Sequence, residues 1–141
     1  MKKITVQANH SNMQKVLDFV EGEMRQNPDF SHKDLLQIHM VIDEIFGNIV
    51  SYAYDDSGGE VEIMMDYDKA QGSMILVFQD EGKPYNPLLN EDPDIKLSAD
   101  ERAVGGLGIF MVKNTMDEID YENRDGKNIL TMKKQIGGSY A

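Results

Sequence analysis

The stretch DEIFGNIVSYAY, residues 43–54, lies in a long apolar segment whose periodicity predicts a helix from about residue 32 to 54. Apolar side chains recur there at steps of three and four residues, forming one continuous core stripe: Leu35, Ile38, Ile42, Ile45 and Ile49. Glu44 and Asn48 stand one turn apart and well away from the stripe, since four residues turn the helix to within about 40° of the starting direction. The segment is therefore expected to have a core face and a separate polar flank.

Gly47 lies on this flank, although glycine within a helix costs about 1 kcal/mol relative to alanine. One interpretation is that it keeps the flank open for a ligand. The other is that the flank is a solvated surface and Gly47 admits a neighbouring helix. The segment taken alone favours the second interpretation.

The composition fits one globular domain over residues 1–141, with 40% hydrophobic and 28% charged residues. A net charge of −11 argues against a nucleic-acid partner, which would need a basic face. Cysteine is absent, so thiolate metal sites and disulfides are excluded. No apolar run is long enough to span a membrane, and the first ten residues lack the apolar centre of a signal peptide. A cytoplasmic location is expected.

The order of the elements predicts an α+β fold with two layers. Strands are expected at 4–8, 61–67 and 73–80, and helices at 13–24, 32–54 and 105–116. Ser31 and Asp34 match a capping box at the start of the second helix. Asp125-Gly126 predicts a tight hairpin near the end of the chain.

Two further segments carry residues suited to ligand binding. In QDEGKPYNP (79–87), Asp80 ends a strand and could accept a hydrogen bond from the exocyclic amine of a base, with Gly82 allowing close approach. In VGGLGIFMV (104–112), glycines precede a helix whose free N–H groups suit phosphates. The second segment matches neither a P-loop nor a Rossmann motif. Taken alone, the first segment strongly favours an ordinary loop, and the second is only weak evidence for an anion site.

The three segments together, in this order, resemble the GHKL ATPase superfamily with its Bergerat nucleotide-binding fold. The chain is most similar to the bacterial anti-sigma factor serine/threonine kinases. DEIFGNIVSYAY matches the asparagine box of that family, DEGKPYNP its first glycine box, and GGLGIFMV its second. The resemblance covers nearly the whole chain. It implies a histidine-kinase-like ATPase fold with a mixed, mainly antiparallel sheet.

The resemblance also implies a role for each residue of the boxes. Asn48 would hold Mg²⁺ against the ATP phosphates, and Glu44 would be the general base. Asp80 would accept from the adenine amino group, with Gly82 beside the base. The phosphates would be wrapped by backbone N–H groups of four consecutive residues, Gly105, Gly106, Leu107 and Gly108. Segment 88–104 would be the ATP lid, from which Arg102 could reach the γ-phosphate.

The chain departs from the family pattern at two places. Pro84 stands where many members have a second glycine, which stiffens the loop on the adenine side. Lys127 and Asn128 follow Gly126, where many relatives have threonines close to the adenine. Asn128 could substitute for them as a polar contact.

The implied function is that of a Mg-ATP-dependent protein kinase acting on serine or threonine of a STAS-domain anti-sigma-factor antagonist. The resemblance also implies a possible sigma factor partner, a role in transcription regulation, and a possible homodimer formed through the N-terminal strand and helix. The alternative is a nucleotide-gated module that sequesters a partner without phosphotransfer. Sites for other metals are not expected, because segment 91–101 lacks the pattern of a calcium loop and the three histidines lack metal-ligand spacing.

Overall fold

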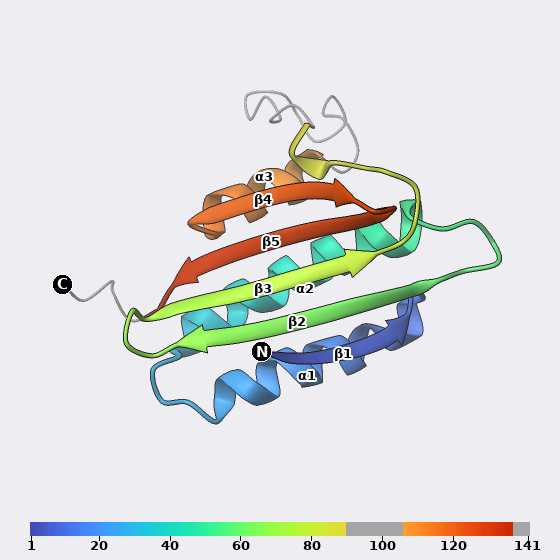
Figure 1. Cartoon of the computed structure of the whole chain (residues 1–141). Helices are drawn as coiled ribbons and strands as arrows, with labels where there is room; N and C mark the ends of the chain where they lie inside the picture. The colour runs from blue at the N-terminus through green and yellow to red at the C-terminus, as the bar shows by residue number, and fades with distance from the viewer. Residues whose placement is uncertain (90–105, 137–141) are drawn as a thin grey trace.

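The computed structural model of the chain describes residues 1–89 and 106–136 (Figure 1). Its elements follow the order β1 (Lys2–Gln7), η1 (His10–Asn12), α1 (Met13–Arg25), α2 (His32–Tyr52), β2 (Glu60–Asp68), β3 (Ser73–Asp80), η2 (Pro87–Leu89), α3 (Gly106–Thr115), β4 (Glu118–Arg124) and β5 (Lys127–Gln135). The expected α+β fold of two layers is confirmed. Of the described helices, none is both long and apolar enough to cross a membrane.

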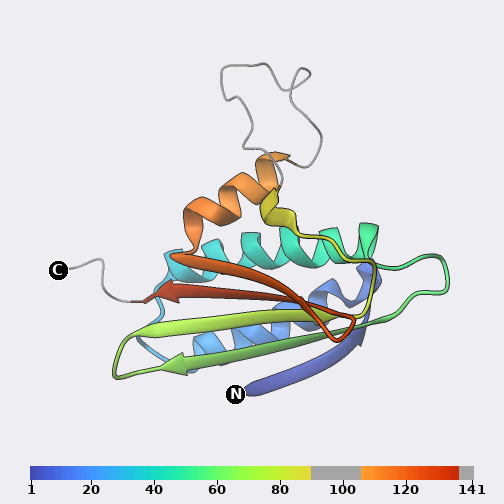
Figure 2. The same cartoon turned by 45° about the horizontal axis from the view of Figure 1, so that its top comes forward.

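One sheet of five strands forms the first layer, in the order β1-β2-β3-β5-β4. All four neighbouring pairs are antiparallel, so the part of the expectation that called the sheet mixed is wrong for the described strands. Two connections are hairpins, β2 to β3 and β4 to β5. The helices lie in the other two connections, with α1 and α2 between β1 and β2 and α3 between β3 and β4. The helices cover one face of the sheet (Figure 2).

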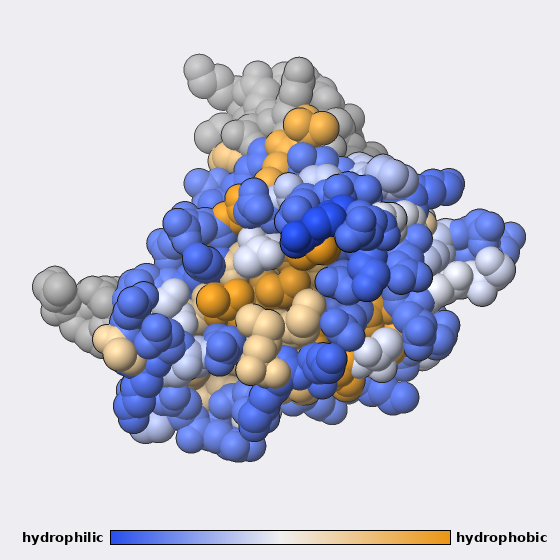
Figure 3. All heavy atoms as spheres, viewed as in Figure 1, coloured by the Kyte–Doolittle hydropathy of each residue, from blue (hydrophilic) through white to orange (hydrophobic). Residues whose placement is uncertain are grey.

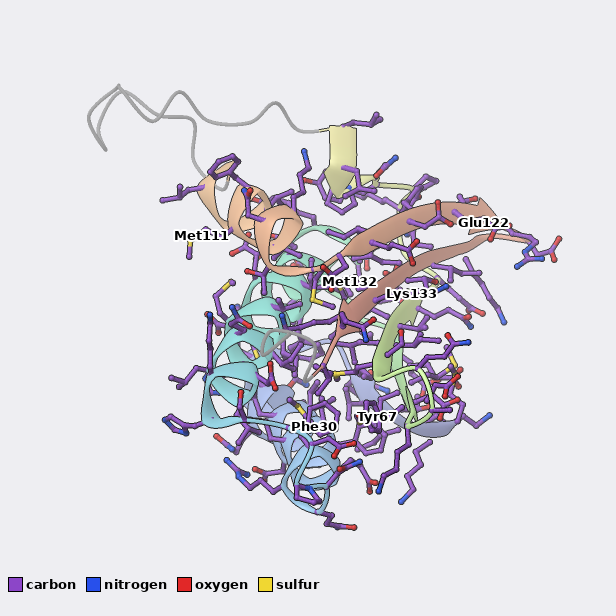
Figure 4. All side chains as sticks on the ribbon, turned by 90° about the vertical axis from the view of Figure 1, so that its left-hand side faces the viewer. Phe30, Tyr67, Met111, Glu122, Met132 and Lys133 are labelled. Carbon is purple, nitrogen blue, oxygen red and sulfur yellow. The ribbon has the colours of Figure 1, made fainter. Side chains whose placement is uncertain are left out.

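The core lies between this face and the helices. Strand residues alternate between the two faces, and those that point toward the helices are almost fully buried. They include Val61, Ile63, Met65, Met74, Leu76, Phe78, Leu130 and Met132. The opposite face is open, and Figure 3 shows apolar atoms over its centre surrounded by hydrophilic atoms. Figure 4 places Met132 on the helix side, whereas its neighbour Lys133 lies on the open side, where it pairs with Glu118 at 3.7 Å.

Helix α2 begins with the predicted capping box. The Asp34 backbone N–H donates to the Ser31 hydroxyl at 3.1 Å, and the Ser31 N–H donates to the Asp34 carboxylate at 2.9 Å. The apolar stripe faces the core as predicted, but Leu35 and Ile49 at its ends are only partly buried. The helix ends at Tyr52, two residues before the predicted end.

The chain that leaves α2 is fixed by Tyr54. Its hydroxyl donates to the Glu60 carbonyl at 2.6 Å and accepts from the Glu81 N–H at 2.7 Å. Partial burial raises the pKa of this hydroxyl, and the nearby carboxylates of Asp80, Glu81 and Glu60 add to the rise, which keeps the proton available for donation. A Cβ at Gly59 would lie 2.2 Å from the ring, so only glycine fits beneath it. Tyr54 thus joins the end of α2 to the start of β2 and the end of β3.

The opposite end of the core is closed by two aromatic rings. The rings of Phe30 and Tyr67 lie 4.8 Å apart between their centroids, and the Tyr67 hydroxyl donates to Asp29 at 2.7 Å (Figure 4). The predicted turn at Asp125-Gly126 is also confirmed. Both residues have positive φ, 55° and 79°, as a two-residue hairpin of type I′ requires.

Gly47 meets no described atom within 4 Å of the position that a Cβ would occupy. Among the described residues, therefore, it does not admit a neighbouring helix, and that interpretation is wrong. As far as the described residues go, the space beside it is open.

Replacing Gly47 with alanine should stabilise the protein. Alanine favours the helix and reduces the entropy of the unfolded chain, and the open space means no new clash, so the free energy of unfolding should rise by about 0.5–1 kcal/mol. Urea denaturation measures this. Gly22→Ala, in an equally open position of α1, is the matched control and should change stability in the same direction. A loss of stability confined to Gly47→Ala would contradict the open environment.

Candidate functional site

A pocket lies between the C-terminal half of α2 and the end of the sheet. Asn48 lines it from α2, and Asp80 lines it from the end of β3. Phe78, Leu130 and other apolar side chains complete its walls. The sequence predicted that all the motif residues would share one pocket. The structure brings Asn48 and Asp80 together in this way, whereas Glu44, Gly82 and Gly108 do not line this pocket.

Two tyrosines stand at the pocket. Tyr52 is 53% exposed and Tyr85 is 36% exposed, and their ring centroids are 5.9 Å apart with an interplanar angle of 38°. Such a combination of apolar walls, accessible aromatic rings and a few polar groups suits a flat heteroaromatic ligand.

Glu44 is linked to the pocket through Asn48. The Asn48 side chain donates a hydrogen bond to the Glu44 carboxylate, as their spacing on one flank of α2 allows. Partial burial raises the pKa of Glu44; the Asn48 hydrogen bond opposes this rise, and the nearby Asp43 carboxylate adds to it. The result is a carboxylate that is a stronger base than an exposed glutamate.

The first turn of α3 lies against Glu44. A Cβ at Gly108 would stand 2.0 Å from the Glu44 carboxyl carbon, so any side chain there would displace the carboxylate. The N-terminal turn of a helix has unpaired N–H groups and a partial positive charge. Gly108 thus brings these groups next to the carboxylate of Glu44.

Asp80 is only 6% exposed and is held by two donors on the same oxygen. Its Oδ1 accepts from the Gly82 N–H at 2.9 Å and from Nδ2 of Asn128 at 2.9 Å. Gly82 itself packs against the end of α2, where a Cβ would lie 2.2 Å from the Ala53 carbonyl oxygen. That contact is enough to explain why residue 82 is a glycine, and no ligand has to be invoked. The sequence alone did not predict this contact.

Asn128 occupies the centre of a hydrogen-bond network. Besides Asp80, its Nδ2 donates to the Lys83 carbonyl at 2.8 Å. Its Oδ1 accepts from the Tyr121 hydroxyl and, at 3.1 Å, from Asn123. Asn128 lines the pocket, but its hydrogen-bonding capacity is used by the protein, so the expected polar contact with the adenine stays a prediction that would require one of these bonds to be exchanged.

The remaining predicted site residues belong to the predicted lid and to the start of α3. Arg102, Gly105 and nearly all of the predicted lid, 88–104, lie outside the described residues. Gly106 begins α3, and Leu107 follows with 40% exposure. The described residues contain no group of three or more His, Asp or Glu side chains that could hold a metal ion.

Sequence reasoning missed three contributors to this site. Ala53 and Tyr54 hold the 80–83 segment, and the Tyr52–Tyr85 pair stands at the pocket. The only signal in the sequence is the cluster of aromatic residues in SYAY, at the end of the quoted helix. Their partners lie far along the chain, so periodicity could not identify them.

Gly82→Ala should destabilise the protein. The added methyl group would overlap the Ala53 carbonyl, which is backbone and cannot rotate away, so a loss of about 1–3 kcal/mol is expected. Thermal or urea unfolding measures the loss, and Gly22→Ala, where the added methyl meets open space, provides the comparison. Equal effects of the two substitutions would contradict the close approach.

Glu44→Gln should make the protein more stable at neutral pH. Burial raises the pKa of Glu44 in the folded state, so the stability contribution of this group is present below the pKa of the unfolded chain and is lost as pH rises through the folded pKa. Glutamine does not ionise. The melting temperature of the variant should therefore exceed that of the wild type at pH 7, and the gap should close below about pH 4.

The control for this prediction is Glu62→Gln, which removes the same charge on β2, away from Asp43. A smaller gain is expected there, because Glu62 alternates with the core residues Val61 and Ile63 and therefore lies on the open face of the sheet rather than against a helix. A destabilised Glu44→Gln variant at pH 7 would contradict the argument.

The chain is similar in sequence to named bacterial protein kinases. The chain is 31% identical over 90 residues to the serine/threonine-protein kinase BtrW of Bordetella bronchiseptica, covering 64% of this chain and 63% of that protein. It is 27% identical over 115 residues to the serine-protein kinase RsbW of Oceanobacillus iheyensis, covering 74% of this chain and 68% of that protein. The matches thus span about two thirds of the length of these relatives.

Solved structures show the same fold. The RsbU and RsbW domains of Rv1364c from Mycobacterium tuberculosis superpose with a TM-score of 0.61 at 15% identity, over 96% of this chain and 33% of that one. The Acinetobacter baumannii histidine kinase AdeS superposes with a TM-score of 0.56 at 16% identity, over 98% of this chain and 70% of that one.

The expected resemblance to anti-sigma factor serine/threonine kinases is therefore confirmed. The profile of the histidine kinase-like ATPase domain matches residues 6–134, from β1 to β5. The chain belongs to the histidine kinase-like ATPase domain family.

Proposed function

We propose that the chain is an ATP-dependent serine/threonine protein kinase of the anti-sigma type, whose substrate is a STAS-domain anti-sigma-factor antagonist. The observation that carries the proposal is the placement of Asn48 and Asp80 in one pocket, with Glu44 bonded to Asn48 and packed against Gly108. The proposal is supported because two carboxylates, an amide and a helix N-terminus then follow one another from Asp80 to Gly108, as recognition of a base and binding of phosphates would require. The named kinase relatives support it.

The nucleotide would bind with its adenine in the pocket. The carboxylate of Asp80 accepts from the adenine amino group, and the Gly82 N–H helps to hold that carboxylate. Backbone N–H groups of residues 105–108 cradle the phosphates, because phosphate oxygens suit the unpaired donors of a helix start. Arg102 would neutralise charge on the γ-phosphate.

A magnesium ion fits the donor set at Asn48. The amide nitrogen of this residue donates to Glu44, which leaves its oxygen for a cation. Mg²⁺ prefers oxygen ligands, retains several waters and is commonly shared with phosphates, so one protein oxygen is sufficient. The ion would neutralise charge that develops on the phosphate oxygens.

Glu44 would act as the general base. A substrate hydroxyl loses its proton to the Glu44 carboxylate as its oxygen bonds to the γ-phosphorus. The bond from that phosphorus to the β,γ-bridging oxygen breaks, and ADP leaves with the electron pair. The raised pKa of Glu44 suits this role, since a base is more effective when its pKa approaches the working pH.

The wider assignments follow from the same family. We propose that residues 1–141 act as one domain, a view that the packing of β1 and α1 into the same core as the motif elements supports. A sigma factor, and a second copy bound through β1 and α1, are further proposed partners. The edge position of β1 fits the latter, because an edge strand has unpaired backbone groups. Transcription regulation in the cytoplasm is the proposed setting.

The test is transfer of the labelled γ-phosphate from Mg-ATP to purified STAS-domain proteins of the same organism. Wild type should label one of them on serine or threonine. Glu44→Gln should reduce the rate by about 10²–10⁴-fold, the range typical of a lost general base. Its affinity for ATP, measured by calorimetry, should change by less than about threefold, since the carboxylate is not placed against the adenine.

Three results would change the assignment. Equal labelling by wild type and Glu44→Gln would remove Glu44 from the role of base. Tight nucleotide binding with no labelled protein would favour the alternative, a nucleotide-gated sequestering module. Failure to bind either ATP or ADP would exclude both functions.

A further inference from the structure

The carboxamide of Asn128 on β5 is aimed at Asp80 and at the segment that follows it. We propose that Asn128 is a positioning residue that makes the site selective for adenine by fixing the carboxylate of Asp80; this rests on the nucleotide binding proposed above. Asn128 is itself only 6% exposed and lies opposite Asp80 in the register of β3 and β5. The two side chains therefore share one face of neighbouring strands.

The orientation of the Asn128 amide is determined by its surroundings. Nδ2 faces acceptors only: Oδ1 of Asp80 at 2.9 Å, the Lys83 carbonyl at 2.8 Å and the Gly82 carbonyl at 3.4 Å. Oδ1 faces donors: the Tyr121 hydroxyl, Nδ2 of Asn123 and the Tyr85 N–H. A reversed amide would place donor against donor and acceptor against acceptor. Only an asparagine in this orientation satisfies both sets.

In this network the two carboxylate oxygens of Asp80 differ in their hydrogen-bond partners. Oδ1 is occupied by Gly82 N–H and by Asn128. No described residue donates a hydrogen bond to Oδ2. Since Asp80 lines the pocket, Oδ2 is the oxygen left to accept from a ligand. Asn128 thus sets which oxygen recognises the base and prevents the carboxylate from turning.

Asn128 also ties this carboxylate to its loop and to the edge of the sheet. The same amide nitrogen that donates to Asp80 also donates to the Gly82 and Lys83 carbonyls, so it holds the loop as well as the carboxylate. Tyr121 on β4 supports the amide from the other side. The hairpin formed by β4 and β5 is therefore part of the base-recognition apparatus, although Asn128 has no hydrogen-bonding capacity left for a base.

The consequence is discrimination at position 6 of the purine. A carboxylate oxygen held in place accepts from the amino group of adenine but repels the carbonyl oxygen of hypoxanthine. A site that is built to accept a hydrogen bond rejects an analogue that lacks the donor, because a buried polar group is then left unpaired. The preference should depend on Asn128, which holds that acceptor in place.

Calorimetry with ADP and inosine diphosphate tests this, since the two ligands share ribose and phosphates. Wild type should bind ADP at least about tenfold more tightly. Asn128→Asp, which has the same shape, places a second carboxyl beside Asp80 and two carbonyls, so the two carboxyls should share one proton. ADP affinity should then fall by about tenfold or more, while inosine diphosphate changes by less than about threefold, because the shared proton can donate to its carbonyl.

Two further variants separate positioning from simple loss of structure. Asn128→Thr retains a hydroxyl donor and fits a strand, so it should keep the ratio of the two affinities within about threefold of wild type. Asn128→Ala removes the donor without adding charge and should lower the ratio by at least about fivefold; it also decides the question if Asn128→Asp does not fold. Asn9→Asp makes the same change at an exposed position after β1 that has no hydrogen bond to Asp80 or Asn128, and its oxygen can still accept from the Ser11 hydroxyl. It is the control and should bind both ligands as wild type does.

The outcomes distinguish this inference from the proposed function. If wild type prefers ADP and the Asp and Ala variants weaken both ligands by the same factor, Asn128 has a structural role only and the inference is overturned. If both variants bind like wild type, it is overturned as well. If wild type binds neither diphosphate, the proposed nucleotide function fails and this inference fails with it.

Discussion

A single backbone hydrogen bond joins the end of α2 to the loop after β3, and the geometry of the site depends on it. The Lys83 N–H donates to the Ala53 carbonyl at 2.7 Å, and Gly82 packs against the same carbonyl. Asn48 stands on one side of this junction, and Asp80 stands on the other. A side chain at position 82 would force the two elements apart, because the contact is between backbone atoms that have no rotamers to adjust.

Two features on the polar flank of α2 oppose the stability of the fold. Glu44 remains partly buried beside Asp43 in a chain of net charge −11, and its raised pKa reflects a folded state that disfavours the charge. Gly47 leaves a helix position open at a cost in propensity. Neither feature is explained by packing among the described residues. Both are understandable if the flank of α2 is kept for a charged ligand that supplies the missing contacts.

The local features of the fold could be predicted from sequence, whereas the contacts that assemble the site could not. Periodicity identified α2, and the Ser31–Asp34 capping box and the Asp125-Gly126 turn were found because their partners are a few residues apart. The adjacency of Gly82 to Ala53 and of Asn128 to Asp80 depends on strand order and register, which no local pattern encodes. The three boxes succeeded as a set because their order reflects the whole topology.

The site has a helical half and a sheet half, and α2 is the element common to both. Glu44 and Gly108 form the first, where N–H groups and a carboxylate meet. Asp80 and Asn128 form the second, where the Asn128 amide holds a buried carboxylate. Asn48 contacts Glu44 in the first half and lines the pocket of the second. Asn48 thus connects the two halves, so under the proposed function a change at this position should affect both the binding of the base and the transfer of phosphate, whereas a change confined to one half should affect mainly one of them.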